Sequence, residues 1–296
     1  MKALVIGGSG FLGGHVVDEL VQRGFETTVF DLHKPQYPNA VNVKFIEGNM
    51  GDESTLEQAI QSQDFVFIFA GIADIKEAHK DPARTIEVNV LYLTRILSLC
   101  TKYQIKRLIY ASTIYVYSNM GSFYKASKQC AEILIESFYE EFGLPYSIVR
   151  YGSLYGPRAN HFNFIHHAIQ EALKHQKITR QGDGSELRDY IHVSDAAVAT
   201  VDQTLANTSN EYIMITGNQT LQVKDVLFMI KEILQNKVEI EFQEGHMEGH
   251  YMMTPYFFKP KVAKKIVLNA YHDLGQGILQ CIHEVHLELE DRKKEQ

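Results

Sequence analysis

Two side chains of the types needed for proton transfer, Tyr124 and Lys128, stand four residues apart. On a helix this spacing places both side chains on one face, with their Cβ atoms about 5–6 Å apart. An isolated tyrosine titrates near pH ~10, and a neighbouring ammonium group favours its phenolate form. The pair therefore has the composition of a general acid-base centre. The same spacing also occurs in ordinary surface contacts, so the surrounding sequence decides between the two interpretations.

The pair belongs to the segment 108–128, which reads LIYASTIYVYSNMGSFYKASK. Its apolar beginning predicts a strand over Arg107–Ala111, and the polar residues after it predict a short loop that leads into a helix. The sequence thus places Tyr124 and Lys128 on a helix that directly follows a strand.

The chain opens with a pattern that predicts a strand, a glycine turn and a helix. The apolar run Lys2–Ile6 is followed by GGSGFLGG at 7–14 and then by apolar residues at helical spacing. Glycines at such a turn let the backbone approach a pyrophosphate, and the first amides of the helix attract its charge. A second strand, Glu26–Phe30, ends at Asp31, whose carboxylate is placed to bind an adenosine ribose and would repel the extra phosphate of NADP. The expected cofactor is therefore NAD.

Strands and helices alternate along most of the chain, which predicts an α/β fold with a Rossmann-like doubly wound parallel sheet. We expect a cofactor domain formed by residues 1–150 and about 189–216. The remaining residues, about 151–188 and 217–296, form a smaller, discontinuous C-terminal lobe. Further strands are expected at Val43–Glu47, Phe65–Phe69, Tyr146–Arg150 and Tyr212–Ile215, and a long helix at Pro82–Lys102.

Composition narrows the range of partners. The 296 residues carry a net charge of -7 and contain no run of Lys or Arg, so neither nucleic acid nor a membrane surface is an expected partner. No apolar run reaches the roughly 18 residues of a membrane span, and we expect a cytoplasmic protein. Cys100, Cys130 and Cys281 fit no metal spacing, and His246 and His250 each follow a glycine, with no Cys or acid in a ligand pattern beside them. No metal is expected.

Several motifs occur in an order that resembles a known family. They are GGSGFLGG at 7–14, Asp31, FAG at 69–71, Asn89, YAST at 110–113, the Tyr124/Lys128 pair, RYGSLYGPR at 150–158 and GDGSELRDYIHVSDAA at 182–197. The chain resembles the extended short-chain dehydrogenase/reductases, in particular the NAD-dependent nucleotide-sugar epimerase/dehydratase group with its UDP-glucose 4-epimerase-like members. The resemblance covers nearly the whole chain, and it implies that the second lobe binds the nucleotide sugar.

The resemblance implies a role for each matching residue. Tyr124 is implied as the catalytic acid-base, Lys128 as the group that holds the nicotinamide ribose and lowers the tyrosine pKa, and Thr113 as the hydroxyl that bonds the reacting sugar. The implied cofactor-binding residues are Gly7, Gly10, Phe11, Leu12, Gly13, Asp31, Asn49, Met50, Ala70, Gly71, Asn89, Ala111, Ser112, Tyr124, Lys128 and Tyr151. The implied substrate-binding residues are Thr113, Ser153, Arg158 and Arg188, with Arg188 as a clamp on the diphosphate.

The chain also departs from its relatives at three places. Only Ser118–Phe123 separates Tyr117 from Tyr124, where many relatives have a longer loop, and this predicts a more open sugar pocket. Asn49 stands where relatives usually have Asp near the adenine, and Ser153 stands where several have Asn facing the diphosphate.

The residues after Thr113 separate the reactions of the family. Dehydratases carry an Asp-Glu pair there and related decarboxylases carry a Glu, because a second acid-base acts at another sugar carbon, whereas this chain has Ile114 and Tyr115. Our hypothesis is an NAD-dependent epimerase, an isomerase that inverts C4 of a UDP-hexose through a transient 4-keto sugar. The alternatives are an NAD(P)H-dependent 4-keto nucleotide-sugar reductase, a 4,6-dehydratase, and a non-catalytic dinucleotide sensor on the same fold. The resemblance also implies a homodimer and a place in polysaccharide biosynthesis.

Overall fold

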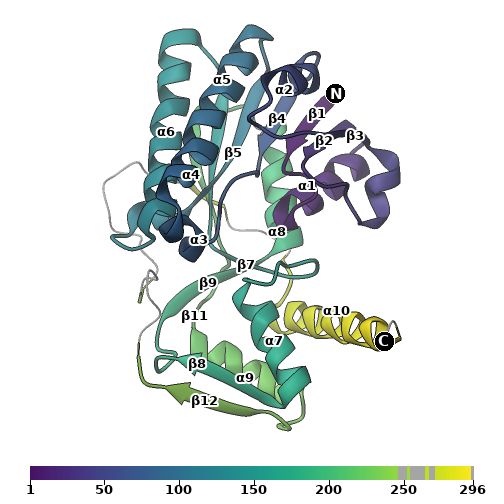
Figure 1. Ribbon diagram of the computed structural model, residues 1–296, viewed down its shortest axis with the longest axis vertical. Helices are drawn as coiled ribbons and strands as arrows, with labels where there is room; N and C mark the ends of the chain where they lie inside the picture. The colour runs from purple at the N-terminus through teal and green to yellow at the C-terminus, as the bar shows by residue number, and fades with distance from the viewer. Residues whose placement is uncertain (246–251, 254–263, 267–270, 295–296) are drawn as a thin grey trace. The chain divides into compact units, whose positions relative to one another are not determined.

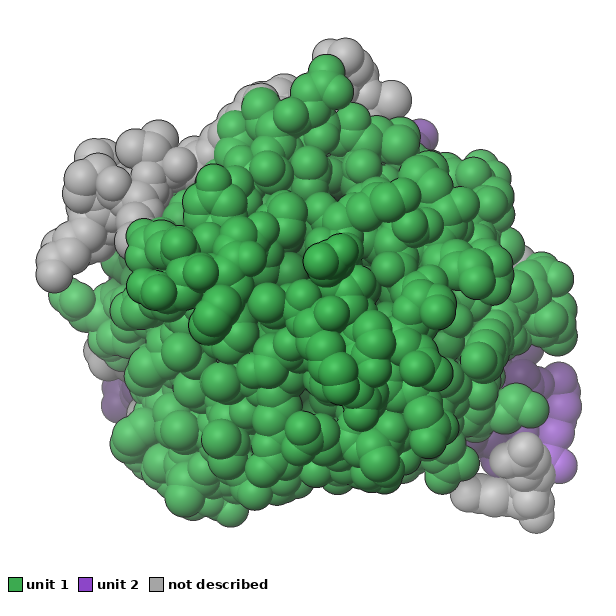
Figure 2. Space-filling view, turned by 90° about the horizontal axis from the view of Figure 1, so that it is seen from above, with its two compact units in different colours: residues 1–151, 196–215, 255–266 green, residues 152–195, 216–254, 267–296 purple. Residues whose placement is uncertain are grey.

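The structure is a computed structural model that describes residues 1–245, 252–253, 264–266 and 271–294 (Figure 1). His246 and His250, which are not expected to bind a metal, lie outside the described residues. The chain forms two compact units, coloured separately in Figure 2. Unit 1 comprises residues 1–151, 196–215 and 255–266, and unit 2 comprises 152–195, 216–254 and 267–296. The predicted domain boundaries remain a prediction; residues 189–195, which are expected in the cofactor domain, belong to unit 2.

Unit 1 is built around one parallel sheet. Its strands are β1 (Lys2–Ile6), β2 (Glu26–Asp31), β3 (Lys44–Glu47), β4 (Phe65–Ile68), β5 (Arg107–Thr113), β6 (Tyr146–Tyr151), β10 (Glu211–Ile215) and β13 (Lys264–Lys265). They lie in the order β13-β10-β6-β5-β4-β1-β2-β3, and each neighbouring pair is parallel. The run from β3 to β6 is the doubly wound order 3-2-1-4-5-6. The predicted fold class is confirmed.

The central strands are apolar because helices cover both faces of the sheet. Strands β4 and β6 are buried along their whole length. The main core of unit 1 packs strand residues such as Leu4, Ile68 and Ile148 against helix residues such as Leu97 and Ile135. Burying one such side chain contributes about 1.5–3 kcal/mol. This packing holds the strand ends, where the predicted site residues stand.

The helices of unit 1 are α1 (Phe11–Gln22), α2 (Glu53–Ile60), α3 (Ile75–Lys80), α4 (Pro82–Ile86), α5 (Tyr92–Lys102), α6 (Ser122–Phe142) and most of α8 (Val193–Val201). Helices α2, α5 and α6 cover one face of the sheet, and α1 and α8 lie on the other (Figure 1). An ion pair of 2.6 Å from Arg23 to Asp202 joins the end of α1 to the segment after α8. The predicted helix Pro82–Lys102 contains a π-helical turn, η2 (Glu87–Leu91), between α4 and α5.

Unit 2 contains two small sheets and three helices among its described residues. One sheet has the order β11-β9-β7, formed by Thr220–Gln222, Leu187–His192 and Ser153–Tyr155; the other pairs β8 (Lys177–Gln181) with β12 (Glu239–Gln243). Helices α7 (Phe164–His175), α9 (Val223–Ile233) and α10 (Leu274–Lys294) pack together through a shared apolar core that includes Ile169, Val226 and Ile278. In the part of the chain that the structure describes, no helix combines the length and apolar character needed to span a membrane.

Candidate cofactor and catalytic site

The strand-to-helix unit that carries the predicted catalytic residues is tightly built. Strand β5 continues to Thr113, two residues beyond its predicted end, and the 3-10 turn η3 (Ile114–Tyr117) follows directly. The Oγ1 atom of Thr113 accepts a hydrogen bond of 3.2 Å from the Tyr115 amide, so the side chain caps this turn. Helix α6 begins after Gly121, whose φ of 100° is left-handed. A Cβ atom at Gly121 would lie 2.8 Å from the Tyr115 ring, so glycine is required there.

Lys128 fastens α6 to the end of β5. Its side chain is buried, and its Nζ atom donates a hydrogen bond of 2.7 Å to the carbonyl oxygen of Ala111. The ammonium group also lies 4.6 Å from the centroid of the Tyr110 ring, within range of a cation–π contact. Burial lowers the pKa of Lys128 to about 8, and the charge of Glu132 opposes this shift. Lys128 is therefore mainly an ammonium ion at neutral pH, close to the pH at which it loses its proton.

Tyr124 lies one helical turn before Lys128 and is half-buried. Its ring packs edge-to-face against the ring of Tyr115, with centroids 6.2 Å apart. Because the amide of Tyr115 bonds to Thr113, one residue contacts both the predicted relay hydroxyl and the predicted acid-base. The structure thus brings the segments of Thr113, Tyr124 and Lys128 together in unit 1. The catalytic roles of the three residues remain predictions.

The glycine turn after β1 is packed so closely that side chains do not fit at two of its positions. Gly7 has a φ of 85°, and a Cβ atom there would collide with the Ala70 amide; a Cβ atom at Gly13 would collide with the Gly7 carbonyl oxygen. Helix α1 begins at Phe11, and its N-cap residue, Gly10, supplies no side-chain hydrogen bond to the first turn. The first amides of the helix are therefore left for another acceptor, and a phosphate group would suit them. These residues fit a dinucleotide.

Asp31 stands beside this turn at the end of β2. Its Oδ2 atom accepts a hydrogen bond of 3.0 Å from the Ser9 amide, and its Oδ1 atom accepts one of 3.2 Å from the His33 amide. These two backbone bonds fix the orientation of the carboxylate. A carboxylate oxygen has more than one acceptor site, so Asp31 retains the capacity to bind ribose hydroxyls.

Asn89 lies in the π-helical turn and links the loop after β4 to α6. Its Oδ1 atom accepts from the Ile72 amide at 2.8 Å, while its Nδ2 atom donates to the Ile72 carbonyl and to Ser127 Oγ, both at 2.9 Å. Ser127 Oγ in turn donates to the Tyr124 carbonyl at 2.8 Å. The Asn89 amide thus holds the loop of Ala70, Gly71 and Ile72 in place next to α6 through its bonds to Ile72 and Ser127.

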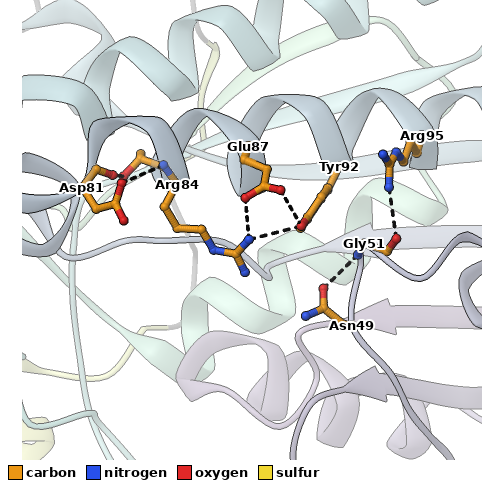
Figure 3. Close-up of polar contacts among 8 residues, drawn as sticks. Asn49, Gly51, Asp81, Arg84, Glu87, Tyr92 and Arg95 are labelled. Atoms are coloured by element: carbon orange, nitrogen blue, oxygen red, sulfur yellow. Dashed lines mark hydrogen bonds and ion pairs between the residues drawn. The ribbon is translucent and has the colours of Figure 1, made fainter.

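A second polar cluster fixes the predicted adenine loop (Figure 3). Asn49 Oδ1 accepts a hydrogen bond of 2.8 Å from the Gly51 amide, and Arg95 donates one of 3.0 Å to the Gly51 carbonyl. The Tyr92 ring packs so closely on Gly51 that a Cβ atom there would lie 2.9 Å from the phenol oxygen. Glu87 accepts a hydrogen bond from the Tyr92 hydroxyl at 3.0 Å. Asn49 therefore shapes the loop through its own side chain, as Asp would at this position.

Comparison with known proteins identifies the family of this chain. A sequence model of the NAD-dependent epimerase/dehydratase family matches residues 3–210. The chain belongs to the NAD-dependent epimerase/dehydratase family. It is 28% identical to a UDP-N-acetyl-alpha-D-glucosaminuronate decarboxylase of Bacillus cytotoxicus, over 95% of this chain and 96% of the relative. It is 29% identical to a dTDP-D-glucose 4,6-dehydratase of Dictyostelium discoideum, over 67% of this chain and 54% of the relative.

A solved structure shows the same fold. The UDP-glucose 4-epimerase of Thermotoga maritima, crystallised with UDP-glucose, aligns with a TM-score of 0.84 and 24% identity, covering 98% of this chain and all of that one. The relatives of this epimerase/dehydratase family member thus include epimerases, a decarboxylase and dehydratases. Membership of the family establishes an NAD-dependent enzyme. The choice among epimerisation, decarboxylation and dehydration depends on the residues of the site.

Of the four predicted substrate residues, Thr113 lies in unit 1, and Ser153, Arg158 and Arg188 lie in unit 2 of this family member. Ser153 begins β7, and Arg188 lies in β9, where its side chain is buried and its Nη1 atom donates to the Leu187 carbonyl at 2.8 Å. Arg158 has a left-handed φ of 62°, and its amide donates a hydrogen bond of 2.5 Å to Glu284 of α10. Their roles toward a nucleotide sugar remain predictions.

A further group in unit 2 has side chains of metal-ligand type. One potential ligand atom from each of His192, Asp195 and His272 lies within 4.8 Å of the others. Asp195 accepts two hydrogen bonds from His272, of 2.7 Å from its backbone amide and 2.6 Å from its ring. These bonds account for the position of the carboxylate without an ion. The sequence-based expectation of no metal remains a prediction.

Sequence reasoning missed a buried ion pair that joins α6 to β6. Glu132 of α6 and Arg150 of β6 are both buried and contact each other at 2.6 Å. The hydroxyl of Ser112, a residue predicted to bind the cofactor, donates a hydrogen bond of 2.6 Å to Glu132 Oε1. The available signal was a charged residue at an apolar position in each element, since Glu132 stands among Ala131, Ile133 and Leu134.

Proposed function

We propose that this protein is an NAD-dependent nucleotide-sugar epimerase that inverts C4 of a UDP-hexose by transient oxidation to the 4-keto sugar. Three facts support the proposal. The family is NAD-dependent, the glycine turn fits a dinucleotide, and a tyrosine, a buried lysine and a threonine hydroxyl gather around the end of β5.

In the proposed reaction the side chains of unit 1 move protons. Bound NAD supplies a hydride acceptor for the sugar carbon and a hydride donor for the return step. Tyr124 removes the proton of the C4 hydroxyl, with Thr113 hydrogen-bonded to the same hydroxyl as donor and acceptor. The Lys128 ammonium group favours the phenolate form of Tyr124. The 4-keto sugar then rotates in the pocket and presents the opposite face of C4 to the cofactor. Tyr124 returns the proton to the C4 oxygen as the hydride returns to that face.

The observation that carries the choice of reaction is the turn after Thr113. Elimination or decarboxylation by the route of the related enzymes uses a carboxyl group here as a second acid-base. In this chain the turn begins with Ile114, which is 1% exposed and packed in the core, and Tyr115, whose ring lies against Tyr124. Neither side chain is a carboxylic acid. Epimerisation needs only the proton transfers that Tyr124 and Thr113 can perform.

The diphosphate clamp, the assembly state and the location belong to the same proposal. Arg188 holds the diphosphate through its guanidinium, which suits phosphate geometry. The protein forms a homodimer through the helix preceding β5 and through α6, where Ile133, Tyr139 and Phe142 are exposed apolar side chains. It works in the cytoplasm and supplies a sugar for polysaccharide synthesis.

One experiment separates the epimerase from its main rival, a 4-keto nucleotide-sugar reductase. The purified protein is denatured, any released dinucleotide is identified, and the native protein is incubated with UDP-hexoses. Stoichiometric NAD and a mixture of C4 epimers support the proposal. An empty protein that binds NADPH preferentially and consumes it with a 4-keto nucleotide sugar would replace it with the reductase.

A further inference from the structure

The ion pair between Glu132 and Arg150 lies beside the catalytic turn of α6. Glu132 and Arg150 are 4% and 2% exposed. They form a two-point contact, from Arg150 Nε to Glu132 Oε1 at 2.9 Å and from Nη2 to Oε2 at 2.6 Å. The guanidinium also lies over the rings of Tyr117 and Tyr212, 4.6 and 4.2 Å from their centroids. A buried ion pair is often no more stabilising than a packed apolar pair. Stability alone therefore does not explain the pair.

The carboxylate of Glu132 is connected to the segments that carry the catalytic residues. Its Oε1 atom accepts the hydrogen bond of 2.6 Å from Ser112 Oγ. Ser112 stands between Ala111, whose carbonyl accepts from Lys128, and Thr113. Glu132 also lies on α6 one turn after Lys128. One carboxylate thus joins β5, β6 and the catalytic helix.

The charge of Glu132 also acts on Lys128. Among the described residues, the titratable groups around the lysine are Tyr110 of β5, which its ammonium contacts, and Tyr124 and Glu132, which stand one turn before and after it on α6. Burial disfavours the ammonium form, and the negative charge of Glu132 opposes that effect. Arg150 carries the balancing positive charge and orients the carboxylate through the two-point contact.

We propose that Glu132 is a positioning residue, which fixes the Ser112–Thr113 end of β5 against α6 and keeps Lys128 an ammonium ion at the pH of catalysis. The link to catalysis rests on the proposed function. The effect on the charge of Lys128 does not, because it is a property of the protein without substrate.

The test follows the titration of Lys128 directly. The protein is prepared with 13Cε-labelled lysine, and the signal of Lys128 is assigned as the one missing from the Lys128→Arg spectrum. We expect Glu132→Gln, which keeps the shape but removes the charge, to lower the midpoint of the Lys128 titration by at least about one pH unit, a tenfold change in the ammonium-to-amine ratio. The matched control, Glu136→Gln, makes the same change one turn further along α6 and leaves the midpoint unchanged.

Glu132→Gln leaves Arg150 as a buried unpaired charge and risks misfolding, so Glu132→Gln/Arg150→Met is measured as well. The double variant lowers the midpoint by a smaller amount, because a repelling positive charge is lost together with the negative one. An unchanged or raised midpoint in the folded variants overturns the proposal. Turnover of an accepted UDP-hexose gives a second readout, in which the alkaline limb of kcat moves to lower pH in Glu132→Gln while KM stays the same. A protein that converts no UDP-hexose refutes the proposed function, and the midpoint still decides the role of Glu132.

Discussion

The buried ammonium of Lys128 makes the stability of the protein depend on pH in a defined way. Burial lowers its pKa from the ordinary value of 10.5 to about 8. Between these values the unfolded chain binds more protons than the folded protein, so the contribution of Lys128 to the free energy of unfolding rises with pH. The penalty for burying the ammonium is present in full below pH about 8, and it is relieved as the pH rises toward the ordinary pKa.

The magnitude follows from the size of the shift. A difference of about 2.5 pH units corresponds to about 3 kcal/mol, of which about 2 kcal/mol is recovered between pH 7 and pH 9.5. Lys128→Met removes the titrating group while keeping an unbranched side chain of similar length. We expect the difference in unfolding free energy, variant minus wild type, to fall by about 2 kcal/mol over this pH interval.

Chemical denaturation of both proteins at matched pH values measures this change. Lys125→Met, on a less buried lysine of the same helix, serves as the control and should show no such trend. Parallel pH profiles for wild type and Lys128→Met would refute the reasoning, because they would mean that Lys128 titrates alike in the folded and unfolded states.

Three other perturbations test separate parts of the site. Gly13→Ala should abolish measurable NAD binding while the fold is retained, since a Cβ atom would collide with the Gly7 carbonyl. Equilibrium dialysis measures the binding and circular dichroism checks the fold, and tight binding of NAD by the variant would contradict the prediction. Asn89→Ala leaves the amide and carbonyl of Ile72 without their side-chain partner and should lower the unfolding free energy by about 2–5 kcal/mol, as measured in urea. A loss below about 1 kcal/mol would show that water replaces both bonds. Arg95→Ala should weaken NAD binding about tenfold through the loss of its bond to the Gly51 carbonyl. Unchanged affinity in calorimetry would show that this bond does not contribute to cofactor binding.

Much of unit 1 follows from the sequence because its signals are local. The apolar run before GGSGFLGG predicted β1 without error, and the positions of β2, β4 and β6 were predicted to within one residue. Most residues of these strands are buried. The apolar run of β1 lies between Lys2 and Gly7, and that of β4 follows Asp64, as expected for strands that are covered on both faces. Strand β5 continued further than expected, since Ser112 and Thr113 are polar and yet pair with β6.

The unpredicted features depend on contacts between distant segments. The π-helical turn at Glu87–Leu91 is not visible in the apolar spacing, and its hydrogen bonds from Asn89 reach residues 17 and 38 positions away. The pair of Glu132 and Arg150 joins a helix to a strand, and neither residue alone indicates the other. Helix α10 was not predicted, because most of its residues are polar and its apolar residues form only a narrow stripe. That stripe can be recognised once the structure shows it packed in the core of unit 2.

The central claim is that Tyr124 is the acid-base of a nucleotide-sugar 4-epimerase, and one comparison tests it most directly. Wild type and Tyr124→Phe, each loaded with NAD, are incubated with UDP-glucose and the other UDP-hexoses, and the ratio of C4 epimers is followed in time. We predict that wild type brings one pair of epimers to equilibrium and that Tyr124→Phe binds NAD with similar affinity but reacts at least about 10²-fold more slowly. A variant that reaches equilibrium at the rate of wild type would contradict the account.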